Sequence, residues 1–245
     1  MNFLLLEQVD STNSYVSLHA AELDDMTMVI ADAQTAGRGQ RGNSWESRPG
    51  LNLTFTLLFR PKGIAPREQF AISEATALAI ADFLNDACID ARVKWPNDIY
   101  VDDSKISGIL IEHSVTSTAI EHTRIGVGLN INQTEFMSDA PNPVSLSMLT
   151  GQAYDISRVA AAVGSHLERR LAQTSTSEGR DAIHSEFKRR LWRGDGNPHP
   201  FRLRDSGRDF AGIIADVEPD GHILILDAEN LQTSRFAFKE VEFLL

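Results

Sequence analysis

A glycine- and arginine-rich stretch organises the rest of this chain, and it reads Ala36-Gly37-Arg38-Gly39-Gln40-Arg41-Gly42-Asn43-Ser44-Trp45. Its glycines let the backbone adopt positive φ angles and approach a ligand closely. Arg38 and Arg41 carry planar guanidinium groups that suit phosphate and carboxylate oxygens, and Trp45 offers a flat apolar face for an adenine or another ring. The stretch therefore predicts a loop that closes over an anion, although a solvated surface turn could have the same composition.

The stretch differs from two common phosphate-binding motifs. It is not a P-loop, because no Gly-Lys-Ser/Thr sequence ends it. It is not a dinucleotide-binding fingerprint, because the glycine spacing differs and Asn43-Ser44-Trp45 does not read as the start of a helix.

Composition narrows the class of protein. The 245 residues carry a formal net charge of −11, whereas nucleic-acid binders are usually basic, so we expect no DNA or RNA partner. The single cysteine, Cys88, excludes an internal disulfide framework and a cysteine metal cluster, and it fits a reducing compartment. Because no stretch suits a signal peptide or a membrane span, the sequence predicts a cytoplasmic protein without a membrane partner.

Strands and helices alternate on both sides of the stretch. Strands are predicted at 3–9, 26–33, 51–59, 92–95, 99–101, 105–113 and 123–131. Helices are predicted from Ser11 or Thr12 as N-cap to about Ala21, from Pro66 onward, at 156–171 and at 182–192. In the helix after Pro66, an apolar stripe at helical spacing predicts a buried face made of Ala77, Ala81, Leu84 and Cys88.

A change in composition after Gly194-Asp195-Gly196-Asn197-Pro198 marks the best domain boundary. Short strands are predicted beyond it at 201–203, 210–217, 222–226, 234–238 and 241–244. Fewer than fifty residues of strands and tight turns predict a small β-barrel.

Three polar features can carry chemistry in addition to the glycine-rich loop. Lys94-Trp95-Pro96-Asn97-Asp98 holds polar side chains beside a stiff proline, although Asn97 and Asp98 could equally cap that turn. Lys105 begins an apolar strand and is either an edge residue or a desolvated cation in a cleft. Asn130 lies in a strand of the buried type, so its amide needs a protein or ligand partner.

Other reactive residues give no convincing site. No serine or cysteine sits in a nucleophile–base pattern, and Cys88 is expected to pack in the core. His113 and His122 flank a predicted hairpin but lack the carboxylates of a zinc site, so we expect no protein-held metal. Cations, amides and flexible glycines remain, and this set suits the stabilisation of negative charge on transferring phosphate.

Taken together and in this order, the motifs closely resemble those of the biotin protein ligases, also called biotin–[acetyl-CoA-carboxylase] ligases. The resemblance is strong from Val9 to about Leu149 and general beyond. It implies an α+β fold with a mixed-sheet catalytic domain like that of class II aminoacyl-tRNA synthetases at 1–193. It also implies an SH3-like β domain at 198–245.

The resemblance also implies the reaction and the residues that serve it. Biotin and ATP, with Mg²⁺, would give biotinyl-5′-AMP, and biotin would then pass to one lysine of a biotin carboxyl carrier domain. The implied catalytic residues are Lys105, Arg38, Arg41 and Asp98. The implied biotin-binding residues are Ser11, Thr12, Asn13, Gln34, Gly37, Arg38, Lys105 and Gly108. The implied ATP- or adenylate-binding residues are Arg38, Gln40, Arg41, Gly42, Trp45, Lys94, Asn97 and Asn130.

Alternatives stay open at this point. Asp98 could orient or deprotonate the acceptor amine, or it could hold the turn at Pro96. Gln40 stands where some relatives carry another arginine. The first predicted strand starts at Phe3, which leaves no room for the DNA-binding segment of many relatives, so we expect a ligase that is not a repressor. A lipoate or octanoate ligase of the same fold and a non-enzymatic binder are the other functions to test, and the sequence does not choose between a monomer and a homodimer.

Overall fold

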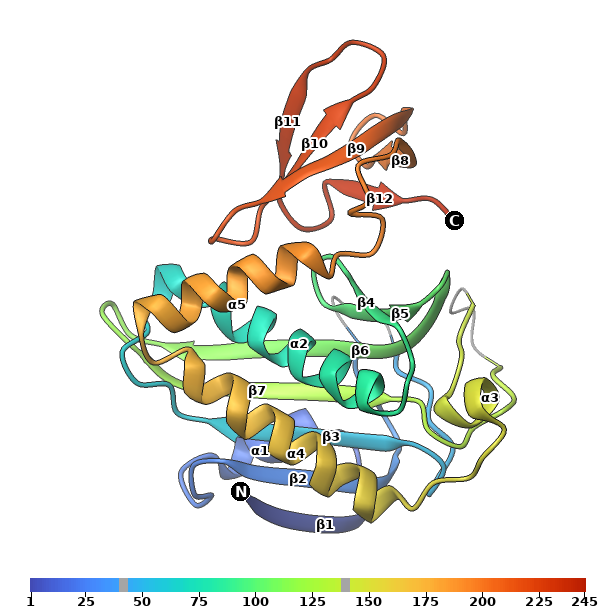
Figure 1. The fold of residues 1–245 in the computed structure, drawn as a ribbon. Coiled ribbons are helices and arrows are strands. Elements are labelled where there is room, and N and C mark those ends of the chain that lie inside the picture. The colour runs from blue at the N-terminus through green and yellow to red at the C-terminus, as the bar shows by residue number, and fades with distance from the viewer. Residues whose placement is uncertain (40–43, 138–141) are drawn as a thin grey trace.

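A seven-stranded mixed sheet forms the centre of the larger part of the molecule. The computed structural model describes residues 1–39, 44–137 and 142–245. The strands lie in the order β1-β2-β3-β7-β6-β5-β4 (Figure 1). β1 is parallel to β2, and the other neighbours are antiparallel. Their bounds are β1 Asn2–Val9, β2 Thr27–Gln34, β3 Leu53–Phe59, β4 Ala91–Lys94, β5 Asp98–Val101, β6 Ser104–Val115 and β7 Ile120–Leu129.

Helices cover the two faces of this sheet unequally. The long helices α2 (Phe70–Asp86), α4 (Ile156–Gln173) and α5 (Ser177–Arg189) lie on one face, and α1 (Thr12–His19) lies on the other (Figure 1). Helix α2 is buried on nearly all sides, because it lies between the sheet and the α4–α5 pair. Short helices are η2 (Pro66–Glu68) and α3 (Leu146–Thr150). No helix within the described ranges combines the length and apolar character needed to cross a membrane.

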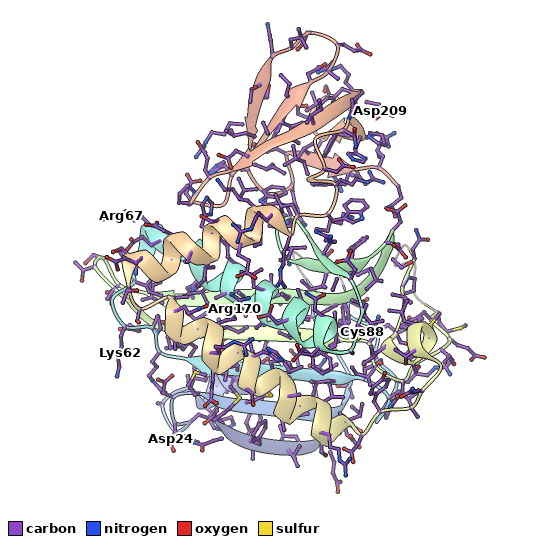
Figure 2. The ribbon with its side chains drawn as sticks, in the orientation of Figure 1. Asp24, Lys62, Arg67, Cys88, Arg170 and Asp209 are labelled. Carbon is purple, nitrogen blue, oxygen red and sulfur yellow. The ribbon has the colours of Figure 1, made fainter. Side chains whose placement is uncertain are left out.

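One carboxylate ties the three long helices together. Asp82 of α2 is 7% exposed and pairs with Arg170 of α4 at 2.7 Å (Nε to Oδ2). Arg190, just after α5, reaches its other oxygen at 2.9 Å, and Arg169 adds a contact at 3.1 Å. Figure 2 labels Arg170 where these helices meet. The burial of Asp82 favours its neutral form, but the hydrogen bonds and charges of these arginines prevail and lower its pKa.

The last fifty residues form a second sheet, which lies beyond the β4–β5 end of the first (Figure 1). All its pairs are antiparallel, and the order is β11-β10-β9-β8-β12. The strands are β8 His199–Leu203, β9 Asp209–Val217, β10 Ile223–Asp227, β11 Thr233–Phe236 and β12 Val241–Phe243. The predicted α+β class with a small C-terminal β domain is confirmed, and we propose the boundary at 194–197 as predicted.

Aromatic rings join the two sheets at the turn that follows β4. The indole Nε1–H of Trp95 donates to the Gly221 carbonyl at 2.9 Å. The same ring meets Phe238 edge-on and Phe243 at a tilt, with centroids 6.1 and 6.4 Å away. This packing fixes the Lys94–Asp98 segment between the two parts of the molecule.

The N-terminal helix ends earlier than predicted, and its first turn has no side-chain cap. Helix α1 stops at His19, and Ser11 occupies its N-cap position. The predicted capping role is not realised, because no side-chain capping bond is made there. Ser11, Thr12 and Asn13 are nevertheless buried, at 3 to 4% exposure, and they face a cavity instead.

The prediction that Cys88 packs in the core is wrong. Helix α2 ends at Asp86, two residues before it, and Cys88 is exposed (Figure 2). Its φ is +61°, and its N–H donates to the Asn85 carbonyl while the Ile89 N–H donates to the Leu84 carbonyl. These are the two bonds of a Schellman motif, in which the left-handed position usually holds glycine. The apolar stripe therefore ends at Leu84.

Cys88→Gly is expected to stabilise the protein by up to about 1 kcal/mol, because glycine adopts a left-handed conformation without the Cβ clash. Urea unfolding measures this change. In Ala87→Gly, the matched control, φ is −86° and only flexibility is added, so a loss of about 0.5–1 kcal/mol is expected. A destabilised Cys88→Gly, or a native thiol that a disulfide reagent fails to modify, contradicts this assignment.

Candidate active site

A cavity of about 940 Å³ opens between the sheet and the C-terminal β domain. The segments that form it are the β1–α1 turn, the end of β2, the residues around Trp45, the turn after β4, strands β6 and β7, and the C-terminal residues. Twelve of the predicted site residues line it, namely Ser11, Thr12, Asn13, Gln34, Arg38, Trp45, Lys94, Asn97, Asp98, Lys105, Gly108 and Asn130. Residues far apart in the sequence thus meet in one cavity.

The predicted site residues that do not line the cavity all belong to the glycine-rich loop. Gln40, Arg41 and Gly42 lie outside the described residues, so their roles stay predictions. The Gly37 carbonyl accepts from the N–H of Trp45, a lining residue, at 3.0 Å. A Cβ at Gly37 would come within 2.7 Å of the Trp45 carbonyl oxygen, so only glycine fits without a shift. Arg38 and Ser44 form a β-bridge that brings the two ends of the loop together.

The two residues predicted to act on charge meet directly. Lys105 Nζ lies 2.7 Å from Asp98 Oδ1, and each side chain is about a quarter exposed (23% and 24%). They come from neighbouring strands, because Asp98 opens β5 and Lys105 lies near the start of β6. The pair places an ammonium and a carboxylate on the cavity wall, where an incoming anion can replace the carboxylate as partner of the ammonium.

Lys94 has a different environment. Its ammonium donates to the Tyr100 hydroxyl at 3.0 Å and lies 4.6 Å from the centroid of that ring. The rings of Trp192 and Phe243 lie at 5.4 and 5.8 Å. Burial lowers the pKa of Lys94, and the nearby Asp98 charge acts in the opposite direction. These contacts hold the Lys94 ammonium at the junction of the two sheets. The predicted contact between Lys94 and ATP stays a prediction.

Asn97 is engaged with the protein backbone. Its side-chain amide donates to the Ile109 carbonyl, and its backbone carbonyl accepts from the Ile109 N–H at 3.1 Å. The two bonds to Ile109 continue the β5–β6 pairing beyond Asp98 and are not the predicted cap of the turn, whereas the predicted adenylate contact of Asn97 stays a prediction. Asn130 is different, because its Nδ2 donates to the Val144 carbonyl at 3.1 Å while its buried Oδ1 has no partner among the described residues.

Trp45 lies flat against two glycines of the sheet. A Cβ at Gly128 would come within 2.2 Å of the indole, and one at Gly108 within 2.9 Å. Lys105 Nζ lies 5.6 Å from the centroid of the same ring, which is within cation–π range. The absence of a side chain at Gly108 and Gly128 therefore leaves the space that Trp45 occupies, and the predicted biotin contact of Gly108 stays a prediction. The indole Nε1 is buried and, within the described part of the chain, has no hydrogen-bond partner.

The end of the cavity formed by Thr12 is a hydrogen-bonding cluster. The Thr12 N–H donates to Gln34 Oε1 at 2.8 Å, so the amide nitrogen of Gln34 is the group left to donate to a ligand. Thr56 of β3, which is fully buried, lies behind Thr12 and was not predicted. Its only signal in the sequence is a hydroxyl in a mostly apolar strand, and Thr54 in the same strand gives the same signal.

The side-chain carboxylates that line the described part of the cavity already have partners. Asp98 pairs with Lys105, and Glu242 pairs with Arg204 at 3.2 Å. Glu46 accepts from Gln133 and from the Met137 N–H, both at 3.0 Å. These paired side chains do not offer a set of free carboxylates for a magnesium ion held by the protein.

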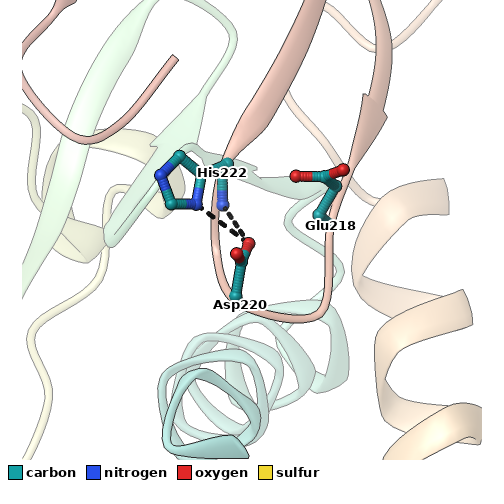
Figure 3. A group of neighbouring side chains, drawn as sticks. All are labelled: Glu218, Asp220 and His222. Carbon is teal, nitrogen blue, oxygen red and sulfur yellow. Dashed lines mark hydrogen bonds and ion pairs between the residues drawn. The ribbon is translucent and has the colours of Figure 1, made fainter. Parts of the chain in front are cut away.

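Glu218, Asp220 and His222 form the one cluster among the described residues whose geometry could suit a metal ion (Figure 3). They lie at the β9–β10 turn. His222 donates its backbone N–H to Asp220 and bonds to it again through Nδ1, at 2.9 Å. The guanidinium of Arg235 pairs with both Glu218 and Asp220. Because that cation and His222 already pair with the carboxylates, the cluster is assigned to the stability of the turn.

The fold resembles that of solved biotin protein ligases. The structure superposes on the biotin protein ligase from Aquifex aeolicus in complex with biotin and ATP with a TM-score of 0.79, 23% identity and 98% and 97% coverage of the two chains. The model of the Biotin/lipoate A/B protein ligase family matches residues 5–130, just over half of the chain. The chain belongs to this family.

Two relatives with assigned names are similar over longer stretches. A biotin–[acetyl-CoA-carboxylase] ligase from Paracoccus denitrificans is 35% identical over 158 residues, which are 62% of this chain and 65% of that protein. An enzyme of the same name from Mycobacterium tuberculosis is 28% identical over 231 residues, which are 90% of this chain and 82% of that protein. The chain thus spans slightly less than two thirds of the Paracoccus protein.

Proposed function

We propose that this protein is a biotin protein ligase that makes biotinyl-5′-AMP from biotin and ATP, then transfers biotin to a lysine of a carboxyl carrier domain. The observation that carries the proposal is the Lys105–Asp98 pair, which lies in one cavity with the polar Thr12–Gln34 end, Trp45 and Asn130. The names of the Paracoccus and Mycobacterium relatives support biotin as the acyl group.

The first step brings two anions together, so it needs positive charge. A biotin carboxylate oxygen attacks the α-phosphorus of ATP, and pyrophosphate leaves. The Lys105 ammonium can exchange Asp98 for the carboxylate and the α-phosphate, and Arg38 on the cavity wall adds a second cation. ATP carries its own Mg²⁺, which neutralises the charge on the departing pyrophosphate. Arg41 stays a predicted third cation.

The two ends of the cavity suit the two ends of the adenylate. Hydroxyl, amide and backbone groups of Ser11, Thr12 and Gln34 match the carbonyl and N–H groups of a cyclic urea. The Trp45 indole and the unpaired Asn130 Oδ1 suit adenine, which offers a ring face and an amino group that donates. Binding at this end would satisfy a buried acceptor that costs free energy while it is unpaired.

The second step transfers the acyl group to an amine. The neutral amine of the acceptor lysine attacks the acyl carbon of the mixed anhydride, the bond from that carbon to the phosphate oxygen breaks so that AMP leaves, and the nitrogen loses one proton to solvent water. Once Lys105 has moved to the anionic ligand, the Asp98 carboxylate is free to accept a hydrogen bond from that amine. Most of the rate enhancement is expected to come from positioning the two reactants.

The test is to incubate the protein with biotin, ATP and a purified carboxyl carrier domain, and to detect biotin on the carrier domain with a streptavidin blot. The expected result is ATP-dependent labelling that disappears when the acceptor lysine is changed to arginine. Parallel reactions with labelled lipoate and octanoate test the alternative ligase activity, and labelling with either acyl group but not with biotin would identify that alternative. Tight binding of biotin and ATP without any adenylate would identify a non-enzymatic binder.

The same acidic chain is proposed to act without DNA. A net charge of −11 opposes the approach of a polyanion. A gel-shift assay with random and palindromic duplexes, with biotin and ATP present, is expected to show no complex. A salt-sensitive complex at micromolar protein would contradict this part of the proposal.

A further inference from the structure

A short hydrogen-bond chain runs from the cavity into the core beneath Thr12. The hydroxyl of Thr56 is fully buried and lies 2.8 Å from Thr12 Oγ1 and 2.8 Å from Asn13 Oδ1. Asn13 in turn directs its Nδ2 at Glu112 Oε2, 3.4 Å away. Thr12 and Asn13 are each 4% exposed and Thr56 is fully buried, so solvent does not compete for the two bonds of the Thr56 hydroxyl.

The number of available protons decides which group donates in each of these hydrogen bonds. A hydroxyl carries one proton, so Thr56 can donate to only one of its two partners. The Asn13 carbonyl oxygen can only accept, which assigns the Thr56 proton to it. The 2.8 Å contact between the two hydroxyls is then a bond in which Thr12 donates to Thr56. The alternative acceptor for Thr12, Gln34 Oε1, is 3.3 Å away and already accepts from the Thr12 N–H.

The far end of the chain fixes the orientation of the Asn13 amide. Glu112 can only accept, so the nitrogen of the amide must face it and the oxygen must face Thr56. Arg124 holds Glu112 at 3.5 Å, and Gly126 leaves the space in which the amide lies. A Cβ at Gly126 would come within 2.8 Å of Asn13 Oδ1. Asn13 therefore orients Thr56, and its predicted contact with biotin stays a prediction.

With its proton directed at Thr56, Thr12 presents only lone pairs to the cavity. We infer that Thr56 is a positioning residue that turns Thr12 into an acceptor and so selects a ligand with an N–H donor, as in a cyclic urea. This inference rests on the proposed function, because it takes the ureido ring of biotin to bind at Thr12. An acyl group without such a donor, such as a fatty acid or a dithiolane, leaves the acceptor unpaired and is disfavoured.

Thr56→Val keeps the shape of the side chain and removes its hydroxyl. Thr12 is then free to donate elsewhere, and the dissociation constant of biotin measured by calorimetry is expected to rise about tenfold, the effect of one buried hydrogen bond. The KM for ATP is expected to stay within about twofold of wild type, which a general loss of structure would not allow. Thr56→Ser, the matched control, restores the hydroxyl and is expected to bind biotin within about twofold of wild type.

Biotin analogues carrying a methyl group on one or the other ureido nitrogen isolate the bond itself. One of the two is expected to bind wild type and Thr56→Val equally, because it no longer offers the N–H that Thr12 accepts. The inference is overturned if both analogues still bind wild type about tenfold more tightly than Thr56→Val. It is also overturned if Thr56→Val binds biotin with the wild-type affinity. Failure of wild type to bind biotin at all would instead overturn the proposed function.

Glu112→Gln tests the same inference if Thr56→Val does not fold. A glutamine at this partly exposed position can donate as well as accept, so it no longer fixes the orientation of the Asn13 amide. Weaker binding of biotin with an unchanged KM for ATP is expected from this variant. Unchanged affinity for biotin in a folded Glu112→Gln would count against the directed chain.

Discussion

Lys105→Met is expected to slow formation of the adenylate by about 100- to 1,000-fold, the usual cost of removing one group that stabilises developing charge. Methionine keeps most of the apolar stem, so the packing beside Trp45 and Gly108 is largely retained. The lost ammonium is the one that pairs with Asp98 at 2.7 Å and that would face the carboxylate and the α-phosphate. Single-turnover formation of labelled biotinyl-5′-AMP measures the effect.

Two further variants separate the chemistry from the loss of an ion pair. Lys62→Met removes an exposed lysine on the surface, away from the cavity (Figure 2), and is expected to react at the wild-type rate. The double variant Asp98→Asn, Lys105→Met has no unpaired carboxylate at this place. If it forms the adenylate at the wild-type rate, the defect of Lys105→Met came from repulsion between Asp98 and the anionic substrates. Wild-type turnover by Lys105→Met would show that the ammonium has no part in the first step.

Asp82→Asn is expected to lower the free energy of unfolding by about 3–5 kcal/mol, because it removes the buried carboxylate that the partly buried Arg170 and Arg190 share. Arg169, Arg170 and Arg190 all contact Asp82, which is 7% exposed. In this variant Arg170 and Arg190 each still pair with Glu186. Urea unfolding at neutral pH measures the loss. In Asp86→Asn, one turn further along α2, an exposed carboxylate is removed, and a change below about 1 kcal/mol is expected.

Asp82 also predicts how stability depends on pH. Its pKa is lower in the folded protein than in the unfolded chain, so its contribution is fully present above the unfolded pKa. The contribution is lost as the pH falls through the lower, folded pKa. The difference in stability between wild type and Asp82→Asn should therefore shrink in acid. An equal difference at pH 7 and at low pH would contradict the role given to this carboxylate.

Much of the sheet and the cavity was predictable because local signals agree there with the tertiary structure. The predicted strands at 51–59 and 105–113 correspond to β3 and β6, although β3 is buried at every position. The predicted cationic and amide residues follow strand ends or enter strands of one sheet. Strands that pair bring such positions together whatever their distance in the sequence.

Other features depend on contacts that no local pattern records. The spacing that included Cys88 in a buried stripe says nothing of where a helix ends, and a Schellman turn without glycine gives no signal. Thr56 resembles any strand threonine until β3 is placed behind α1. Helix α3 has only five residues, and its N-cap Ser145 stands in a loop-like sequence. The C-terminal residues reach the cavity only through the aromatic packing around Trp95.

The central claim is that this cavity activates the biotin carboxylate with ATP, and biotin-dependent exchange of labelled pyrophosphate into ATP tests it most directly. Exchange is expected with biotin and the wild-type protein, without any acceptor domain, and it is expected to fall by at least about 100-fold in Lys105→Met. Absence of exchange from a folded wild-type protein that binds both substrates would contradict the claim.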